Sequence, residues 1–267
     1  MIQTRSPAVA GTFYPADREQ LAGMLASWLD TGEDGMPAPK ALIAPHAGYI
    51  YSGPVAGRAY ARLAAARSRI TRVVLAGPAH RVAVRGLALP GVDAFATPLG
   101  TVPLDRDAIA AIADLPQITV SVAAHAWEHS LEVHLPFLQT VLDRFTLVPL
   151  VVGDAEPAAV EEVLDRLWGG PETLIVISSD LSHYLPYRTA QTVDHETAQA
   201  ILDLRADITH RQACGATPAN GLLRAARRHG LAPALVDLRN SGDTAGDKTR
   251  VVGYGSFAFM EAAANEH

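Results

Sequence analysis

KALIAPHAGYIYSG, residues Lys40–Gly53, is the stretch that decides the fold class of this chain. It opens with a short apolar run, Ala41–Ala44, of the kind that forms a buried strand. Pro45 ends that run, and His46 follows at once in a glycine-bearing loop. Open α/β sheets present their chemistry at the carboxyl ends of such strands. We therefore expect His46 to lie at a functional edge of a sheet.

The same pattern recurs twice along the chain. The apolar run Val73–Ala76 leads to His80, and the run Leu174–Ile177 leads to Asp180 and His183. Segments with helical periodicity separate these strands, which favours a mostly parallel or mixed sheet with helices on both faces. The sequence thus predicts an α/β fold, and we expect its last strands to be antiparallel.

Proline and threonine positions predict where two of the helices begin. We expect one helix to begin at Pro54, and another to be capped by Thr217 with Pro218 at its first position. No linker is long enough to separate two folding units, so residues 1–267 are predicted to form a single domain.

The composition excludes several classes of protein. The formal net charge is −6, whereas a nucleic-acid binder normally carries a basic face. No run of 18 apolar residues could span a membrane, and the first 20 residues lack the apolar core of a signal peptide. The only cysteine is Cys214, which rules out an intrachain disulfide and fits a reducing compartment. We expect a cytoplasmic protein that contacts neither nucleic acid nor membrane.

His46 and His80 are the first candidates for a metal site. Each follows a strand and a proline, which stiffens the loop from which the imidazole emerges. Two imidazoles from strand ends could bind a transition metal, and the alternative is that each only hydrogen-bonds a loop carbonyl. Cys214 precedes a predicted helix N-terminus, where the helix dipole favours a thiolate, although a lone cysteine is often a small buried hydrophobe.

Further candidates lie in two histidine-bearing segments. Asp180 and His183 could be metal ligands or a base with its orienting carboxylate, unless Asp180 only caps a turn. His129 and Glu132 share a helical face, on which His134 fits poorly. Glu132 could be a general base or a ligand, and one or two of the three could be structural. The chain contains no HExxH zinc motif, phosphate-binding loop, dinucleotide fingerprint or GxSxG nucleophile elbow.

Five segments spread over most of the chain share the pattern of one family: APHAGYIYSG around His46, LAGPAH to His80, EHSLEVHLPF from Glu128 to Phe137, ISSDLSHY around Asp180 and His183, and ACGATP around Cys214. Together these segments resemble the Memo family. Bacterial members often belong to a three-part system with a radical-SAM protein and an AMMECR-type protein, in which they are called protein B. The resemblance implies a fold similar to the LigB-type class III extradiol dioxygenases, which hold non-haem Fe(II).

The resemblance also implies a set of site residues. Metal ligands carried over from the family are His46, His80 and Cys214, and Fe(II) is the first expectation, with copper or zinc as alternatives. Asp180 and His183 would line the same cleft. Eukaryotic members are described as phosphotyrosine-peptide binders and as copper- or iron-binding redox proteins. Their cleft uses a tryptophan near the N-terminus, where this chain has Phe13. The other residues assigned to such a cleft are Tyr51, His129 and His134.

Three functions remain open from the sequence. The first is a metal-dependent redox enzyme of dioxygenase-like type, with His183 as acid or base. The second is a non-catalytic module whose cleft binds a peptide or partner protein, or handles metal. The third is a zinc-dependent hydrolase with Glu132 as the base. The substrate and the oligomeric state are not predicted.

Overall fold

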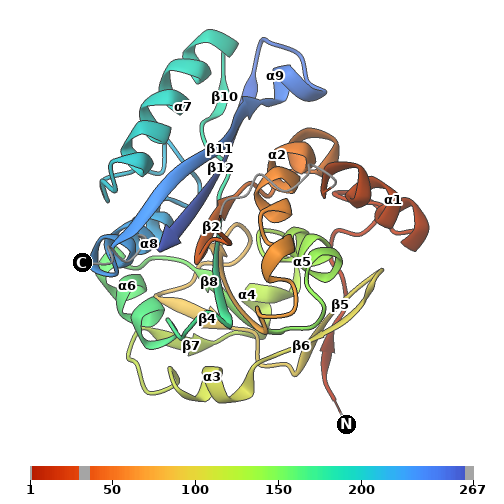
Figure 1. Ribbon diagram of the computed structural model, residues 1–267, viewed down its shortest axis with the longest axis vertical. Coiled ribbons are helices and arrows are strands. Elements are labelled where there is room, and N and C mark those ends of the chain that lie inside the picture. The colour runs from red at the N-terminus through yellow and green to blue at the C-terminus, as the bar shows by residue number, and fades with distance from the viewer. Residues whose placement is uncertain (1, 30–36, 262–267) are drawn as a thin grey trace.

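Nine strands form one large mixed sheet at the centre of the protein (Figure 1). The computed structural model describes residues 2–29 and 37–261. The strands of the sheet lie in the order β10-β12-β2-β9-β3-β8-β4-β7, and β11 also pairs with β12. Their bounds are β2 (Ala41–Ala44), β3 (Arg72–Pro78), β4 (Leu87–Leu89), β7 (Ile118–Val120), β8 (Thr146–Val152), β9 (Thr173–Ser178), β10 (His183–Leu185), β11 (Leu231–Asn240) and β12 (Val251–Glu261).

The strands at the middle of this sheet are parallel. β2 pairs with β9, β9 with β3, and β3 with β8, all in the parallel sense. β10 and β11 both pair antiparallel with β12, which confirms the expectation for the last strands. Because parallel neighbours end at the same edge, the loops after β2, β3 and β9 meet there.

Helices cover both faces of the sheet, as the alternation of side chains requires. In β2, Leu42 and Ala44 contribute to one buried cluster, whereas Ala41 and Ile43 contribute to the other. Helices α1, α2, α4 and α5 pack on the first face and α3, α6, α7 and α8 on the second (Figure 1). Their bounds are α1 (Arg18–Leu29), α2 (Tyr49–Ala61), α3 (Arg106–Ala110), α4 (Val122–Ala126), α5 (Leu135–Val141), α6 (Pro157–Arg166), α7 (Tyr187–Leu202) and α8 (Ala216–Arg228).

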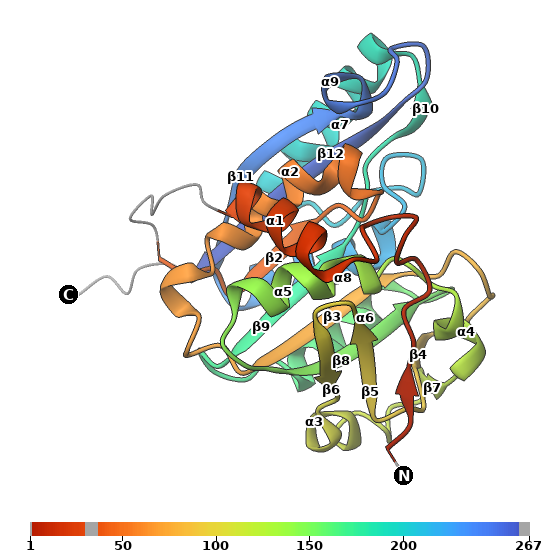
Figure 2. The ribbon, with the colours of Figure 1, turned by 90° about the vertical axis from the view of Figure 1, so that its right-hand side faces the viewer.

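A small second sheet ties the N-terminal arm to the body of the protein. β1 (Thr4–Arg5) pairs with β5 (Ala94–Thr97), which pairs with β6 (Gly100–Pro103), and Figure 2 shows the three strands side by side near the N-terminus. Short helical turns complete the chain: α9 (Ser241–Thr244) and two 3-10 turns, η1 (Ala64–Ala66) and η2 (Glu132–His134). None of the helices in the described ranges is both long and apolar enough to cross a membrane.

Two predicted helix starts are wrong. α2 begins at Tyr49, so that Pro54 lies inside the helix. Its first turn is held by a distant contact, because the Tyr49 N–H donates to the carbonyl of Phe13 at 2.8 Å. α8 begins at Ala216 rather than after Thr217, and Gly215 at its N-cap donates its N–H to Ser179 Oγ at 2.9 Å. In both cases tertiary hydrogen bonds extend the helix beyond the local proline signal.

Candidate functional site: a histidine cluster at the carboxyl edge of the sheet

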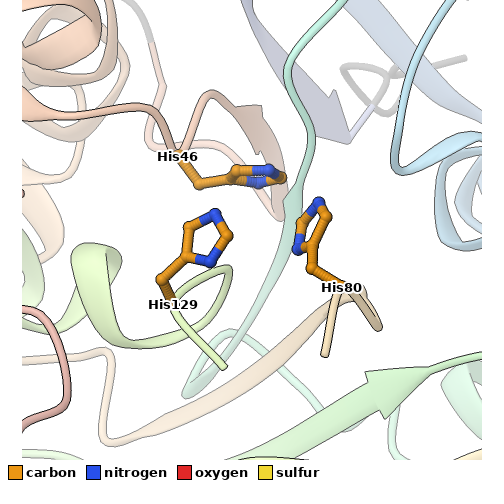
Figure 3. A group of neighbouring side chains, drawn as sticks. All are labelled: His46, His80 and His129. Carbon is orange, nitrogen blue, oxygen red and sulfur yellow. The ribbon is translucent and has the colours of Figure 1, made fainter. Parts of the chain in front are cut away.

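Three histidines meet where the parallel strands end. His46 follows β2, His80 follows β3, and His129 comes from the irregular segment between α4 and η2. Each offers one ring nitrogen, and the three nitrogens lie within 4.8 Å of one another. The ring centroids are 5.1 Å apart for His46 and His80 and 4.6 Å apart for His80 and His129, and Figure 3 shows the rings facing a common point. The arrangement is suited to binding a metal ion.

Hydrogen bonds fix which nitrogen of His46 carries the proton. Ser178, at the end of β9, donates its hydroxyl to the carbonyl of Ser130 at 2.5 Å. Its oxygen therefore accepts from His46 Nδ1, 2.6 Å away, because a hydroxyl has one proton. The lone pair of His46 is consequently on Nε2. A metal-ligating histidine normally has this arrangement, with its other ring nitrogen bound to a protein oxygen.

Glu128 fixes His80 in the same way. Its carboxylate accepts from His80 Nδ1 at 2.9 Å and from the His80 backbone N–H at 2.6 Å. Burial alone would raise the pKa of Glu128, but the hydrogen bonds from His80 and from the Ser130 N–H lower it to about 2. An ionised carboxylate accepts a proton, so His80 carries its proton on Nδ1 and its lone pair on Nε2.

His129 is the third member of the cluster and is half-buried. Its ring packs against Phe13, with centroids 4.7 Å apart, so Phe13 borders the histidine cluster. The Nδ1 atom is buried without a hydrogen-bond partner among the described residues, and Glu128 Oε1 is 3.4 Å away. Burial lowers the pKa of His129 to about 4, and it also lowers the pKa of His46. Both are thus neutral at pH 7, which is the form that binds metals.

Cys214 lies beside His46 but outside the group of three. Its Sγ is 3.3 Å from His46 Nε2, and the thiol can donate there or to the carbonyl of Asp180 at 3.6 Å. Burial and then the charge of Asp180 raise the pKa of the thiol to about 12. Desolvation therefore opposes the thiolate that a position before a helix N-terminus favours. A bound cation would reverse this balance.

Asp180 holds the His46 loop by hydrogen bonds to its backbone. Its carboxylate accepts the backbone N–H groups of His46 at 2.8 Å and Ala47 at 3.3 Å. Burial raises the pKa of Asp180 to about 6 against these hydrogen bonds. His183 is half-buried at the start of β10, and a positive charge on its ring would lower the pKa of both Asp180 and His46. The roles predicted for Asp180 and His183 in acid–base chemistry stay predictions.

The predicted roles of Glu132 and His134 do not fit their positions. Glu132 is fully buried, and its carboxylate is occupied by Arg5, Tyr14 and the backbone of the N-terminal arm. His134 is also fully buried, with Nδ1 2.8 Å from the hydroxyl of Tyr60. Neither side chain is free to reach a substrate, because η2 turns both into the core, whereas the irregular segment before η2 turns His129 toward the cluster.

Tyr51 lies in the first turn of α2 and is half-buried. The role predicted for Tyr51 as a cleft residue stays a prediction.

Sequence reasoning missed three residues that orient the ligands. Glu128 and Ser130 flank His129, and Ser178 precedes Asp180, but a glutamate or serine in a loop carries no signal of its own. The only available signal was position, since each lies within two residues of a predicted site residue. Their partners lie 48 residues or more away along the chain, so only the fold pairs them.

Comparison with known proteins identifies the family of this chain. The Memo-like protein family model matches residues 5–258. The chain belongs to the Memo family. Its Memo relatives include a "MEMO1 family protein" of Aquifex aeolicus, 36% identical over 97% of this chain and all of that protein. Another, from Archaeoglobus fulgidus, is 35% identical over 96% of this chain and 99% of that protein.

A solved structure resembles this Memo chain in fold alone. It is the uncharacterized protein JW3007 of Escherichia coli K12, which superposes with a TM-score of 0.52 at 15% sequence identity. The match covers 81% of this chain and 98% of that one. The predicted family and the α/β fold with a mixed sheet and helices on both faces are thus confirmed.

Proposed function

We propose that this Memo protein binds one transition-metal ion at the carboxyl edge of its sheet and uses it for redox chemistry on a small substrate. The observation that carries the proposal is the convergence of His46, His80 and His129, whose ring nitrogens lie within 4.8 Å of one another. Imidazole nitrogen is a ligand that iron, copper and zinc share. Fe(II) is the first expectation, and copper and zinc are the alternatives.

The protonation of the candidate ligands suits such an ion, and so does their spacing. His46 and His80 each have their Nδ1 proton bound by a protein oxygen, which leaves Nε2 free to ligate. Cys214 Sγ, 3.3 Å from His46 Nε2, is close enough to add a thiolate to the same ion. A bound Fe(II) or copper ion would supply one-electron chemistry with dioxygen or a substrate in its open positions.

The chain's own residues supply the remaining functions. Asp180 holds the His46 loop through two backbone N–H groups, which keeps the imidazole at the strand end. His183 is the side chain we propose for moving a proton, because it is half-buried beside Asp180 and can exchange with solvent. Phe13 covers the His129 ring and restricts water on that side.

The test is elemental analysis with EPR on protein purified without oxygen. One equivalent of iron or copper is expected in the wild type, and none in His46→Ala. His195→Ala is the matched control, since His195 is exposed on α7. Parallel measurements on Cys214→Ser and His129→Ala identify the third ligand: its loss lowers the affinity and alters the spectrum, whereas loss of a bystander does neither. Full metal retention in His46→Ala would refute the proposed site, and one equivalent of zinc alone would refute the redox chemistry.

A further inference from the structure

Hydrogen bonds link three consecutive residues, Glu128–Ser130, to every histidine of the cluster, directly or through Ser178. Glu128 binds both the ring and the backbone of His80, at 2.9 and 2.6 Å. His129 is itself the third member. The carbonyl of Ser130 accepts from Ser178, whose oxygen holds the ring of His46. The position of the Glu128–Ser130 segment therefore sets the separation and orientation of all three imidazoles.

This segment has no regular secondary structure to fix it. It lies between α4, which ends at Ala126, and the 3-10 turn η2, which begins at Glu132. A site that must hold its ligands accurately needs support from residues around them. The support comes from the other end of the chain.

Arg5 binds both sides of the segment with one side chain. Its Nε donates to the carbonyl of His125, one NH2 group donates to the carbonyl of Glu128, and the other donates to Glu132 Oε2, each at 2.7 Å. The planar guanidinium has donors in a fixed arrangement, so these three points are held at fixed separations. Arg5 is 120 or more residues from each of its partners and is itself buried.

Glu132 anchors this arginine to the N-terminal arm. Its oxygens also accept the backbone N–H groups of Ala8 and Val9, at 2.7 and 3.0 Å, and the hydroxyl of Tyr14 at 2.7 Å. The same arm carries Phe13, which packs on His129. The buried Arg5–Glu132 pair thus joins the arm to the segment that carries the cluster.

We propose that Arg5, anchored by Glu132, is a positioning residue for the histidine cluster. Arg5 touches neither substrate nor ligand. It acts by holding Glu128 and His129 in the arrangement that lets His80 and His129 face His46. The inference rests on the proposed metal site for its role, and the geometry through which it acts is measurable without metal.

The experiment compares Arg5→Met with Arg5→Lys in the full chain, with cobalt(II) as the probe because its visible spectrum reports the number and geometry of its ligands. Arg5→Met should bind cobalt(II) about 10–100-fold more weakly than the wild type, as is typical when support around a ligand is lost. Its spectrum should also change, and Arg5→Lys should recover part of both.

Arg72→Met is the matched control. Arg72 makes a similar ion pair with Asp105 at 2.8 Å, but it starts β3, the end of that strand opposite His80. Arg72→Met should lose stability and keep the wild-type cobalt(II) affinity and spectrum. The positioning role is refuted if Arg5→Met keeps both as well, or if Arg72→Met changes them equally.

A metal-free measurement separates this inference from the proposed function. The nitrogen-15 shifts of the His80 and His129 rings report their hydrogen bonding in the protein without metal, and Arg5→Met should change them. If the wild type takes up no cobalt(II), the proposed function fails, while unchanged ring shifts in Arg5→Met would overturn the role of Arg5. If Arg5→Met does not fold, Glu132→Gln replaces it, with the same shifts expected and the same outcome refuting the role.

Discussion

Replacing Glu128 by glutamine tests whether this carboxylate holds His80, which we propose as a metal ligand. Glu128 is buried, and its two oxygens accept four N–H groups: the ring and backbone of His80 and the backbones of His129 and Ser130. A glutamine keeps one acceptor oxygen and places an amide donor where the other was. At least one buried donor then faces another donor.

The size of the effect follows from the contacts. The least damaging orientation puts the amide against the single His80 backbone N–H, which costs about 1–3 kcal/mol for an unsatisfied buried donor. The three remaining hydrogen bonds weaken because they lose the charge. The pKa gives a similar figure, since lowering it from 4.5 to about 2 corresponds to about 3 kcal/mol in favour of the carboxylate. We expect Glu128→Gln to lose about 2–4 kcal/mol of unfolding free energy.

The assay combines urea denaturation of the metal-free protein with zinc titration against a competing chelator. Glu128→Gln should also bind zinc about 10–100-fold more weakly, because the ring of His80 is no longer oriented. Glu161→Gln is the control, since Glu161 is buried and accepts from Arg224 and Arg228 on the second face of the sheet. It should lose stability without losing affinity. Wild-type zinc affinity in Glu128→Gln would refute the reasoning.

Two further predictions concern stability. Burial lowers the pKa of His134 to about 3. Below pH 6.5 this histidine therefore binds a proton in the unfolded chain but not in the folded protein, and the unfolding free energy falls as the pH falls. His134→Asn should reduce the slope of unfolding free energy between pH 4.5 and 6 by about 1.4 kcal/mol per pH unit, and an unchanged slope in urea denaturation would contradict this. Gly57→Ala should destabilise by about 1–2 kcal/mol, because overpacking against Trp28 outweighs the gain in helix propensity. A Cβ there would lie 2.6 Å from Trp28 Cβ. Gly23→Ala, whose Cβ would meet nothing within 4 Å, should raise Tm in the same thermal scan, and a higher Tm in Gly57→Ala would contradict the clash.

The sheet was predictable because its signal is local. Runs such as Ala41–Ala44 and Val73–Ala76 are apolar throughout, which is what a strand buried on both faces requires. In the structure these runs alternate between two buried clusters, one on each face. The helix starts were predicted less well, because Tyr49 and Gly215 are held by hydrogen bonds to Phe13 and Ser179 that no local pattern reveals.

The site residues, like the helices and strands, were only partly predictable from the sequence. His46 and His80 were identifiable because each follows a parallel strand, and parallel strands must end at one edge of the sheet. Cys214 was a candidate from its place before a predicted helix N-terminus and from the resemblance. It lies beside His46, and its role as a ligand stays a prediction. Among His129, Glu132 and His134 the sequence offered no choice, since their spacing fits no single regular structure.

The sequence by itself therefore determined the α/β class and the strand ends that carry His46 and His80, because strand formation and its termination depend on neighbouring residues. Only the tertiary structure decided that His129 completes the cluster while Glu132 is buried against Arg5. The physical reason is that the irregular segment around His129 takes its conformation from partners such as Arg5, more than 100 residues away along the chain. Such contacts exist only after the N-terminal arm has packed against that segment.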